Sequence, residues 1–130
     1  MLGLTLLPEK LAVCRLERAA TLPAWATQSS FFSITCTTDE LSIVCPQAVV
    51  PDGVVCEREW SALKVAGPLD FALVGILASL AQPLAAAGIS IFAISTYDTD
   101  YLLVKADKLT QAVAVLRAEG HLIEMDMSHD

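Results

Sequence analysis

Four cysteines and two histidines are the side chains to consider first for covalent chemistry or metal binding. The cysteines, Cys14, Cys36, Cys45 and Cys56, form no C-x-x-C pair, and each lies in an apolar, strand-like run. This pattern favours buried free thiols in a reducing compartment over a disulfide framework or a metal centre.

The histidines give little support to catalysis or metal binding. His121 stands at the start of a strand-like run with no orienting acid beside it, which disfavours a Cys–His nucleophile pair. Asp126, His129 and Asp130 could hold a surface metal ion, but an acidic tail is usually solvated. The sequence also contains no phosphate loop, no G-x-G-x-x-G and no H-E-x-x-H motif. We therefore expect no enzyme, no metal and no cofactor.

The composition favours a folded protein that binds neither nucleic acid nor membranes. The 130 residues are 55% hydrophobic and 18% charged, with a net charge of −7. An acidic chain cannot neutralise phosphates, so nucleic acid and anionic membrane surfaces are poor partners. Met1–Pro8 is too short for a secretory signal, and Pro83 and Gly88 interrupt the apolar stretch Leu69–Phe92, which favours a buried helix over a membrane span. We expect a cytoplasmic location.

Two parts of the chain resemble each other at an offset of 60 residues. Residues 31–44 and residues 91–104 each contain a β-rich run, a polar tip of Thr and Asp, and a second β-rich run. This order is typical of a β-hairpin. Upstream, residues 11–14 resemble residues 63–66, at an offset of 52. The identical pairs in the hairpins are Phe32/Phe92, Ile34/Ile94 and Val44/Val104.

Helical periodicity separates these strands in the second half of the chain. One helix is predicted before the second hairpin and one after it, with Asp107 as its N-cap and Gly120 just beyond its end. Leu122-Ile123 then offers a final short strand. In the first half, the corresponding connections have room only for one or two helical turns. The apolar residues at helical spacing are Val74, Leu77, Leu80, Ala81 and Leu84, then Leu109, Ala112, Val113 and Leu116.

Each half therefore has the order strand, helix, strand, strand, helix, strand. This order predicts an α+β protein of two tandem ferredoxin-like (βαββαβ) units, the first of them abbreviated. The expected domains are residues 1–59 and residues 60–130.

Two segments of the second half resemble a known family. Gly75-Ile76-Leu77 and the residues up to Ile91 resemble the helix entry of ACT domains. Ile94–Val104, with its Ser-Thr-Tyr-Asp-Thr-Asp run, is similar to the hairpin of an ACT subfamily that includes aspartate-kinase regulatory regions and the CASTOR arginine sensors. The resemblance is strong over residues 60–122 and weak over residues 9–59.

The resemblance implies a regulatory or sensor module that binds an amino acid between ACT units and has no catalytic activity. Matched to the family's motif, the ligand-binding positions are Gly75, Ile76, Thr96, Tyr97 and Asp100. The resemblance also implies a homodimer and a possible regulated protein. CASTOR-like sensors have four ACT units and this chain has two, so a complete pocket could require a second chain.

Elementary chemistry allows this assignment and also leaves alternatives. Gly75 lets a ligand approach the backbone, the N–H groups at a helix start suit a carboxylate, and Asp100 suits an ammonium or guanidinium group. Alternatively, Pro68 and Asp70 mark an earlier helix start and leave Gly75 inside the helix as a packing residue.

The hairpin tip and the overall function have alternatives as well. Residues 96–100 could be a polar tip held only by Thr and Asp hydrogen bonds. Glu40, which the offset of 60 pairs with Asp100, favours a degenerate first site. The alternative function is a structural or protein-interaction dimer that binds no ligand.

Overall fold

The structure is a computed structural model that describes residues 2–67 and 74–125. The chain forms two compact units. The N-terminal unit comprises residues 9–60, and the C-terminal unit combines the first eight residues with residues 61–130. The domain limits 1–59 and 60–130 stay a prediction, but the first eight residues group with the C-terminal unit. Within the described ranges, no helix is long and apolar enough to cross a membrane.

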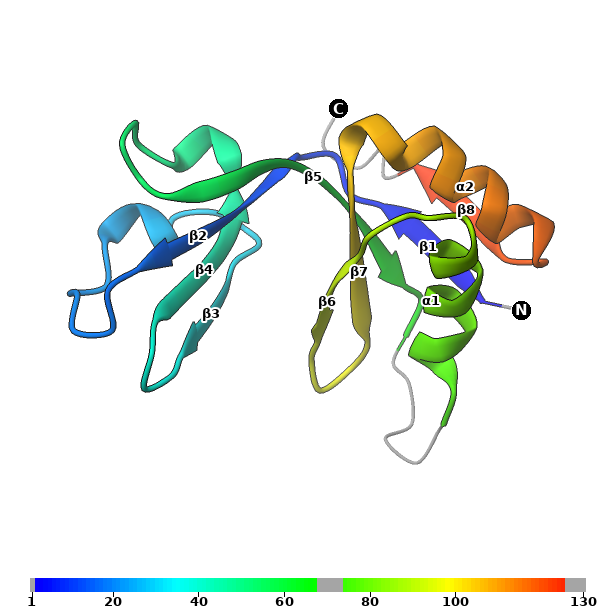
Figure 1. The fold of residues 1–130 in the computed structure, drawn as a ribbon, viewed down its shortest axis with the longest axis horizontal. Helices are drawn as coiled ribbons and strands as arrows, with labels where there is room; N and C mark the ends of the chain where they lie inside the picture. The colour runs from blue at the N-terminus through cyan, green and yellow to red at the C-terminus, as the bar shows by residue number, and fades with distance from the viewer. Residues whose placement is uncertain (1, 68–73, 126–130) are drawn as a thin grey trace. The chain divides into compact units, whose positions relative to one another are not determined.

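The C-terminal unit contains a sheet with the strand order β6-β7-β5-β1-β8 (Figure 1). β1 pairs antiparallel with β5 and parallel with β8, and β6 pairs antiparallel with β7. The elements of this unit are β1 (Gly3–Leu6), the end of β5 (Cys56–Val65), α1 (Ile76–Ala86), β6 (Phe92–Ser95), β7 (Asp100–Lys105), the 3-10 helix η3 (Ala106–Lys108), α2 (Leu109–Ala118) and β8 (Leu122–Met125).

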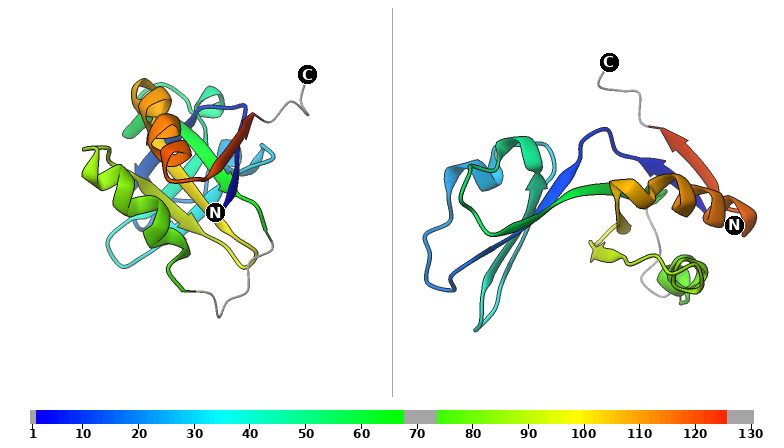
Figure 2. Two further views of the ribbon diagram at one scale, coloured as in Figure 1. Left: turned by 90° about the vertical axis from the view of Figure 1, so that its right-hand side faces the viewer. Right: turned by 45° about the horizontal axis from the view of Figure 1, so that its top comes forward.

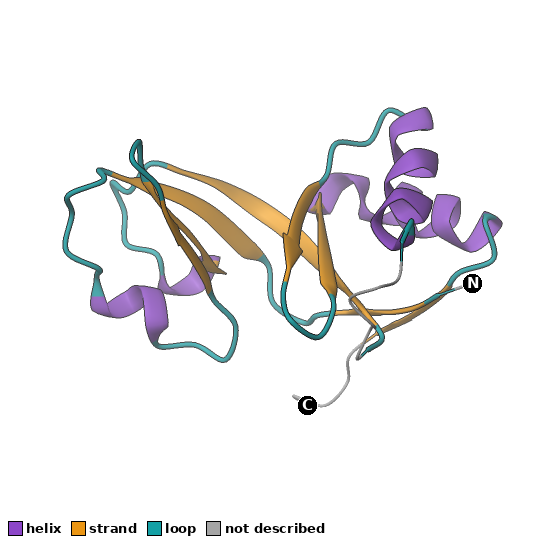
Figure 3. Ribbon diagram, turned by 90° about the horizontal axis from the view of Figure 1, so that it is seen from below, coloured by secondary structure: helices purple, strands orange, loops and turns teal. Residues whose placement is uncertain are grey.

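Both α-helices cover the same face of this sheet (Figure 3). The strands contribute alternate side chains to the covered face, and each helix contributes one apolar stripe, because side chains repeat every two residues in strands and every 3.6 in helices. Full burial of one such side chain contributes about 1.5–3 kcal/mol. The buried cluster consists of Leu4, Leu6, Leu63, Val65, Leu80, Leu84, Ile89, Leu102, Val104, Ala112, Leu116 and Ile123.

The first strand of the chain is missing from the sequence-based prediction, which treats Met1–Pro8 only as a segment too short for a signal. In the structure β1 lies between β5 and β8 and pairs with both. Leu122 N–H donates to Leu2 O at 2.9 Å, and Ala66 N–H donates to Gly3 O at 2.8 Å. The C-terminal unit therefore has the ferredoxin-like strand order with one additional strand, β1, inserted between β5 and β8.

The N-terminal unit repeats the ferredoxin-like strand order without α-helices. Its strands follow the order β3-β4-β2-β5, all antiparallel. Two 3-10 helices stand where the C-terminal unit has α1 and α2, which confirms that the first unit is abbreviated. Its elements are β2 (Leu11–Leu16), η1 (Ala24–Thr27), β3 (Ser33–Cys36), β4 (Leu41–Pro46), η2 (Gln47–Val49) and the start of β5.

The two hairpins correspond to each other at an offset of 59 residues, so the predicted offset of 60 is wrong by one. β3 starts at Ser33 and β6 at Phe92, and the strands that follow start at Leu41 and Asp100. This difference matters because a shift of one residue in the alignment assigns every side chain of a strand to the opposite face of the sheet. Asp100 corresponds to Leu41 rather than to Glu40, so the comparison with Glu40 says nothing about a first site.

The two ends of α2 differ in how well the sequence predicts them. Asp107 is not the N-cap: it lies in the 3-10 helix before α2, and Lys108 holds the cap position without a side-chain hydrogen bond. Gly120 has the expected left-handed backbone, with φ 92°. His121 N–H donates to Leu116 O at 3.1 Å and Gly120 N–H donates to Arg117 O at 3.0 Å, the pattern of a Schellman motif.

Two cysteine thiols belong to the core of the N-terminal unit. Cys14 is 1% exposed and Cys45 is fully buried, and both pack in the cluster beneath η1. Burial, reinforced by the neighbouring Cys45 and Cys56, raises the pKa of the Cys14 thiol to about 12. Burial also raises the pKa of Cys45. The folded chain therefore holds both thiols in the protonated form.

This ionisation predicts a loss of stability at alkaline pH. In the unfolded chain Cys14 ionises near its ordinary pKa of 9.0, whereas in the folded chain it keeps its proton up to about pH 12. The unfolded state thus releases a proton first, and rising pH favours unfolding by up to about 1.4 kcal/mol per pH unit within this window. Urea titrations between pH 7 and pH 11 under reducing conditions will measure this slope.

Cys14→Val is the matched variant, because it keeps an apolar side chain of similar size and cannot ionise. Its free energy of unfolding should fall less steeply above pH 9 than that of the unmodified chain, while the two slopes agree below pH 8. Equal slopes above pH 9 would contradict a protonated Cys14 in the folded core.

Candidate functional site

The first half of the predicted site lies at the beginning of α1. Gly75 occupies the N-cap position with a left-handed backbone, φ 78°, which glycine adopts without strain. Its carbonyl accepts a hydrogen bond from Ser79 N–H at 2.9 Å. The alternative that places Gly75 inside the helix is therefore wrong; Pro68 and Asp70, on which it rested, lie outside the described residues.

Among the described residues, no side chain caps the backbone N–H groups at the start of α1. The N–H groups of Ile76, Leu77 and Ala78 begin the helix and have no acceptor within it. Gly75 has no side chain to cap them, and the first turn contains no acidic residue to offset their positive potential. The side chain of Ile76 packs against the core cluster. Its contribution to a ligand can therefore come only from its backbone.

The second half of the site is the turn between β6 and β7. Thr96 N–H donates to Thr99 O at 2.9 Å, and the Thr96 hydroxyl donates to the same oxygen at 3.0 Å. Thr99 N–H donates back to the Thr96 hydroxyl at 3.3 Å. Thr96 thus holds the turn, as the alternative for this tip proposed, and its hydroxyl can offer a ligand only an acceptor. Tyr97, the residue after it, is 79% exposed.

Thr99, which is not among the five residues predicted from the sequence, holds this turn in place. Its side chain is 4% exposed, and its hydroxyl donates to Val65 O, at the end of β5, at 2.7 Å. This bond fixes the turn to the end of β5. A threonine at a polar tip gives no sequence signal of burial, since its acceptor is 34 residues away.

Asp100 is the acidic group of the site. It begins β7 and lies on the same side of that strand as Leu102 and Val104, which are fully buried beneath the helices. Asp100 itself is half-buried, at the open end of this covered face. Asp98, within the turn, is exposed. The turn thus interrupts strand alternation, as convergence of Thr96 and Asp100 requires.

The five predicted residues form two groups at one end of the C-terminal unit. Gly75 and Ile76 start α1, and Thr96, Tyr97 and Asp100 surround the β6–β7 turn. The start of α1 and this turn lie at the same end of the unit in Figure 1 and in the left view of Figure 2. The backbone N–H groups at the start of α1 and the Asp100 carboxylate therefore lie at the same end of the unit.

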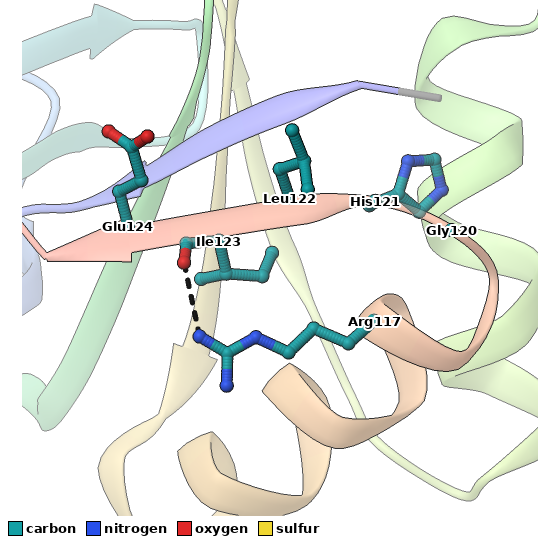
Figure 4. A pocket seen from close by; sticks show the side chains of 6 residues that line it. All are labelled: Arg117, Gly120, His121, Leu122, Ile123 and Glu124. Atoms are coloured by element: carbon teal, nitrogen blue, oxygen red, sulfur yellow. Dashed lines mark hydrogen bonds between the residues drawn. The ribbon is translucent and has the colours of Figure 1, made fainter.

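A separate hollow of about 550 Å³ lies where α2 meets β8 (Figure 4). Arg117 reaches from α2 and donates to Ile123 O at 3.1 Å, which ties the helix to the strand. His121 is buried, and its Nδ1 accepts a hydrogen bond from Leu2 N–H at 3.1 Å. This nitrogen is engaged in the fold and cannot act as a base. The lining residues are Arg117, Gly120, His121, Leu122, Ile123 and Glu124.

The described residues give no basis for a metal centre. Within the ranges that the structure covers, no three His, Cys, Asp or Glu side chains form a group that could hold a metal ion. The tail residues Asp126, His129 and Asp130, considered above as metal ligands, lie outside the described residues. All four cysteines belong to the N-terminal unit, and both histidines to the C-terminal unit.

Comparison with known proteins identifies two segments of the chain. Residues 55–118 match the model of the ACT domain family. Residues 9–53 match a second family model, described as an N-terminal domain. The human protein named cytosolic arginine sensor for mTORC1 subunit 1 is 44% identical over 64 residues, which are 47% of this chain and 20% of that protein. The chain thus spans about a fifth of the length of the curated relatives it matches.

Solved structures extend the similarity to the whole chain. A crystal structure of a protein from Agrobacterium tumefaciens is 38% identical, has a TM-score of 0.92, and the match covers 99% of this chain and 96% of that one. The regulatory subunit of aspartate kinase from Thermus thermophilus has a TM-score of 0.64 over 89% of this chain and 95% of its own, at 8% identity, and shares the fold. The family match shows that residues 55–118 of this chain form a domain of the ACT family.

Proposed function

We propose that this protein is a regulatory module that binds an amino acid, changes the behaviour of a second protein and catalyses no reaction. The ACT family match over residues 55–118 supports this proposal, as do the names of two similar proteins, an arginine sensor and a regulatory subunit. The human relative is named as cytosolic, and we propose the cytoplasm for this protein too.

The observation that carries the proposal is the uncapped start of α1 at the same end of the unit as Asp100. A free amino acid carries an α-carboxylate and an α-ammonium group, so its site needs both signs of charge. The N–H groups of Ile76, Leu77 and Ala78 suit the carboxylate. Asp100 pairs with the α-ammonium group or with a basic side chain.

The remaining residues complete the proposed site. The Thr96 hydroxyl has already given its hydrogen to Thr99 O, so it accepts from the ligand's cationic group. Gly75 leaves space beside the helix start, because a Cβ built there meets no atom within 4 Å. Tyr97, whose side chain is exposed, lies at the rim of the proposed site and covers the ligand. These groups bind and orient a zwitterion, and none of them is a nucleophile paired with a base.

A second copy of the chain is the other proposed partner. β8 ends the described sheet order of the C-terminal unit, and Leu122 and Met125 on it are 57% and 64% exposed. A sheet edge with exposed apolar side chains favours pairing with another chain. A homodimer would also double the number of ACT units.

The first prediction concerns the charge of Asp100. In a calorimetric screen of the common amino acids, beginning with arginine, one of them should bind, and at 100 times its Kd should stabilise the chain by about 2.7 kcal/mol. Asp100→Asn should weaken this ligand at least about tenfold, because the ligand's cationic group loses a half-buried partner. Asp98→Asn is the control, since Asp98 is exposed on the same turn, and should change Kd less than about twofold.

If no amino acid binds at millimolar concentration, the protein is instead an interaction dimer without a ligand. If a ligand binds but Asp100→Asn holds it as tightly as the unmodified chain, the site lies elsewhere and the regulatory proposal stands without it.

The second prediction separates stability from binding at the start of α1. In Ala78→Glu, a carboxylate in the first turn meets the free N–H groups, which should stabilise the helix by about 0.3–1 kcal/mol. The same carboxylate occupies the donors proposed for the ligand and repels it. Tm should therefore rise while affinity falls several-fold. Ala78→Gln adds the same length without the charge and should change affinity less. Unchanged affinity in Ala78→Glu would contradict a carboxylate site at this helix.

The third prediction concerns assembly. Light scattering coupled to size-exclusion chromatography should give twice the mass of one chain at micromolar to millimolar concentration. A single-chain mass throughout this range would contradict the proposed dimer.

A further inference from the structure

Three of the four cysteines lie together in the N-terminal unit. Cys14 on β2 is directly opposite Cys56 on β5, and Cys45 on β4 is opposite Ala12, two residues from Cys14. Cys14 and Cys45 belong to the buried cluster of this unit, and Cys56 packs against it. All three side chains therefore share one face of the sheet.

The hydrogen-bond register brings Cys14 and Cys56 closest. Arg15 N–H donates to Val55 O at 2.9 Å, so residues 15 and 55 form a hydrogen-bonded pair. The adjacent pair, Cys14 and Cys56, is then a non-hydrogen-bonded pair, in which Cα atoms are about 4.5 Å apart and side chains approach most closely. A disulfide needs Cα atoms about 4.4–6.8 Å apart.

The three thiols differ in their access to solvent. Cys14 is 1% exposed and Cys45 is fully buried, whereas Cys56 is partly exposed. A dissolved oxidant therefore reaches Cys56 first. Cys14 is the thiol positioned to react next, because it lies directly across the strand pair, while Cys45 is a diagonal neighbour of Cys14 on the opposite side of β2.

We propose that Cys14 and Cys56 form a reversible disulfide that links β2 to β5. The oxidant is a low-molecular-weight disulfide such as oxidised glutathione. The Cys56 sulfur, after losing its proton, attacks one sulfur of this disulfide, and one glutathione leaves as a thiolate and takes up a proton. The Cys14 sulfur then attacks the Cys56 sulfur and displaces the second glutathione, whose sulfur takes up the proton that the Cys14 thiol loses in this step. The protein thiols lose two electrons and two protons, and glutathione disulfide gains them as two thiols.

The position of this link gives it a structural effect. The N-terminal unit has 3-10 helices where its partner unit has α-helices, so its core is small, and small cores gain most from covalent links. The link joins two strands that are 42 residues apart in sequence, since 56 minus 14 is 42. It therefore removes many unfolded conformations and stabilises the unit.

The test incubates the full chain with excess oxidised glutathione and maps the product by peptide mass spectrometry without reduction. The expected product contains a Cys14–Cys56 cross-linked peptide, has lost two hydrogens within the protein, and reverts with dithiothreitol. The exposed Cys36 can also bind glutathione, so the experiment is repeated with the Cys36→Ser variant, in which this reaction cannot occur. Tm of the cross-linked chain should exceed that of the reduced chain by about 5 °C or more.

Matched variants decide which thiols react. Cys56→Ser should abolish the internal disulfide, and Cys45→Ala, which removes a thiol as buried as Cys14, should leave it intact. Both variants are compared by circular dichroism to confirm that they fold. A Cys14–Cys45 link in the unmodified chain, an internal disulfide that persists in Cys56→Ser, or three unreacted core thiols after prolonged oxidation would each overturn the proposal.

Discussion

The strand that the rest of the structure depends on is β5, whose ten residues pair with β2 at one end and with β1 at the other. Its regular alternation is interrupted at Glu59, where φ is 66° and one extra residue shifts the register against β2. A left-handed backbone is costly for a residue with a side chain. Here it is held by contacts from the residue before β2 and from η2: Lys10 Nζ lies 3.2 Å from the Glu59 carboxylate, and Glu59 N–H donates to the Gln47 side chain at 2.8 Å. Each unit can therefore set its own register on a single strand.

Local patterns in the sequence predicted the hairpins, both α-helices and the abbreviated first unit, because these depend on residues close together in the chain. Non-local pairing was harder to predict. The pattern missed β1, whose neighbour β8 lies more than a hundred residues away, since a four-residue strand has too few residues to show alternation. The offset of 60 was chosen because it aligns identical residues such as Ile34 and Ile94. The strand pairing gives a different offset: Ser33 pairs with Val44 in the first hairpin, and Phe92 pairs with Leu103 in the second, so equivalent residues are 59 apart. Similarity between side chains does not determine strand register, and it is the register that decides which face of the sheet each side chain occupies.

The same distinction explains which parts of the candidate site the sequence could predict. Gly75 precedes a helical pattern and takes a conformation that suits glycine, so local reasoning placed it correctly at the start of α1. Thr96 belongs to a turn whose bonds lie within four residues. Thr99 differs, because its role depends on a bond to Val65 that only the folded sheet creates. The sequence pattern treats hairpin tips as solvated, so it could not show that Thr99 fixes the turn to the end of β5.

The two units also differ in what they can offer a ligand. A carboxylate at a helix start gains from the aligned peptide dipoles of several turns. α1 has eleven residues after Gly75, whereas η1, its counterpart in the N-terminal unit, has four residues after Pro23. So short a 3-10 helix aligns few dipoles, and Pro23, lacking an N–H group, adds no donor at its start. Under the proposed mechanism, each chain would hold one amino acid, in the C-terminal unit. The N-terminal unit is then free to serve another purpose, and it is this unit that carries all four cysteines.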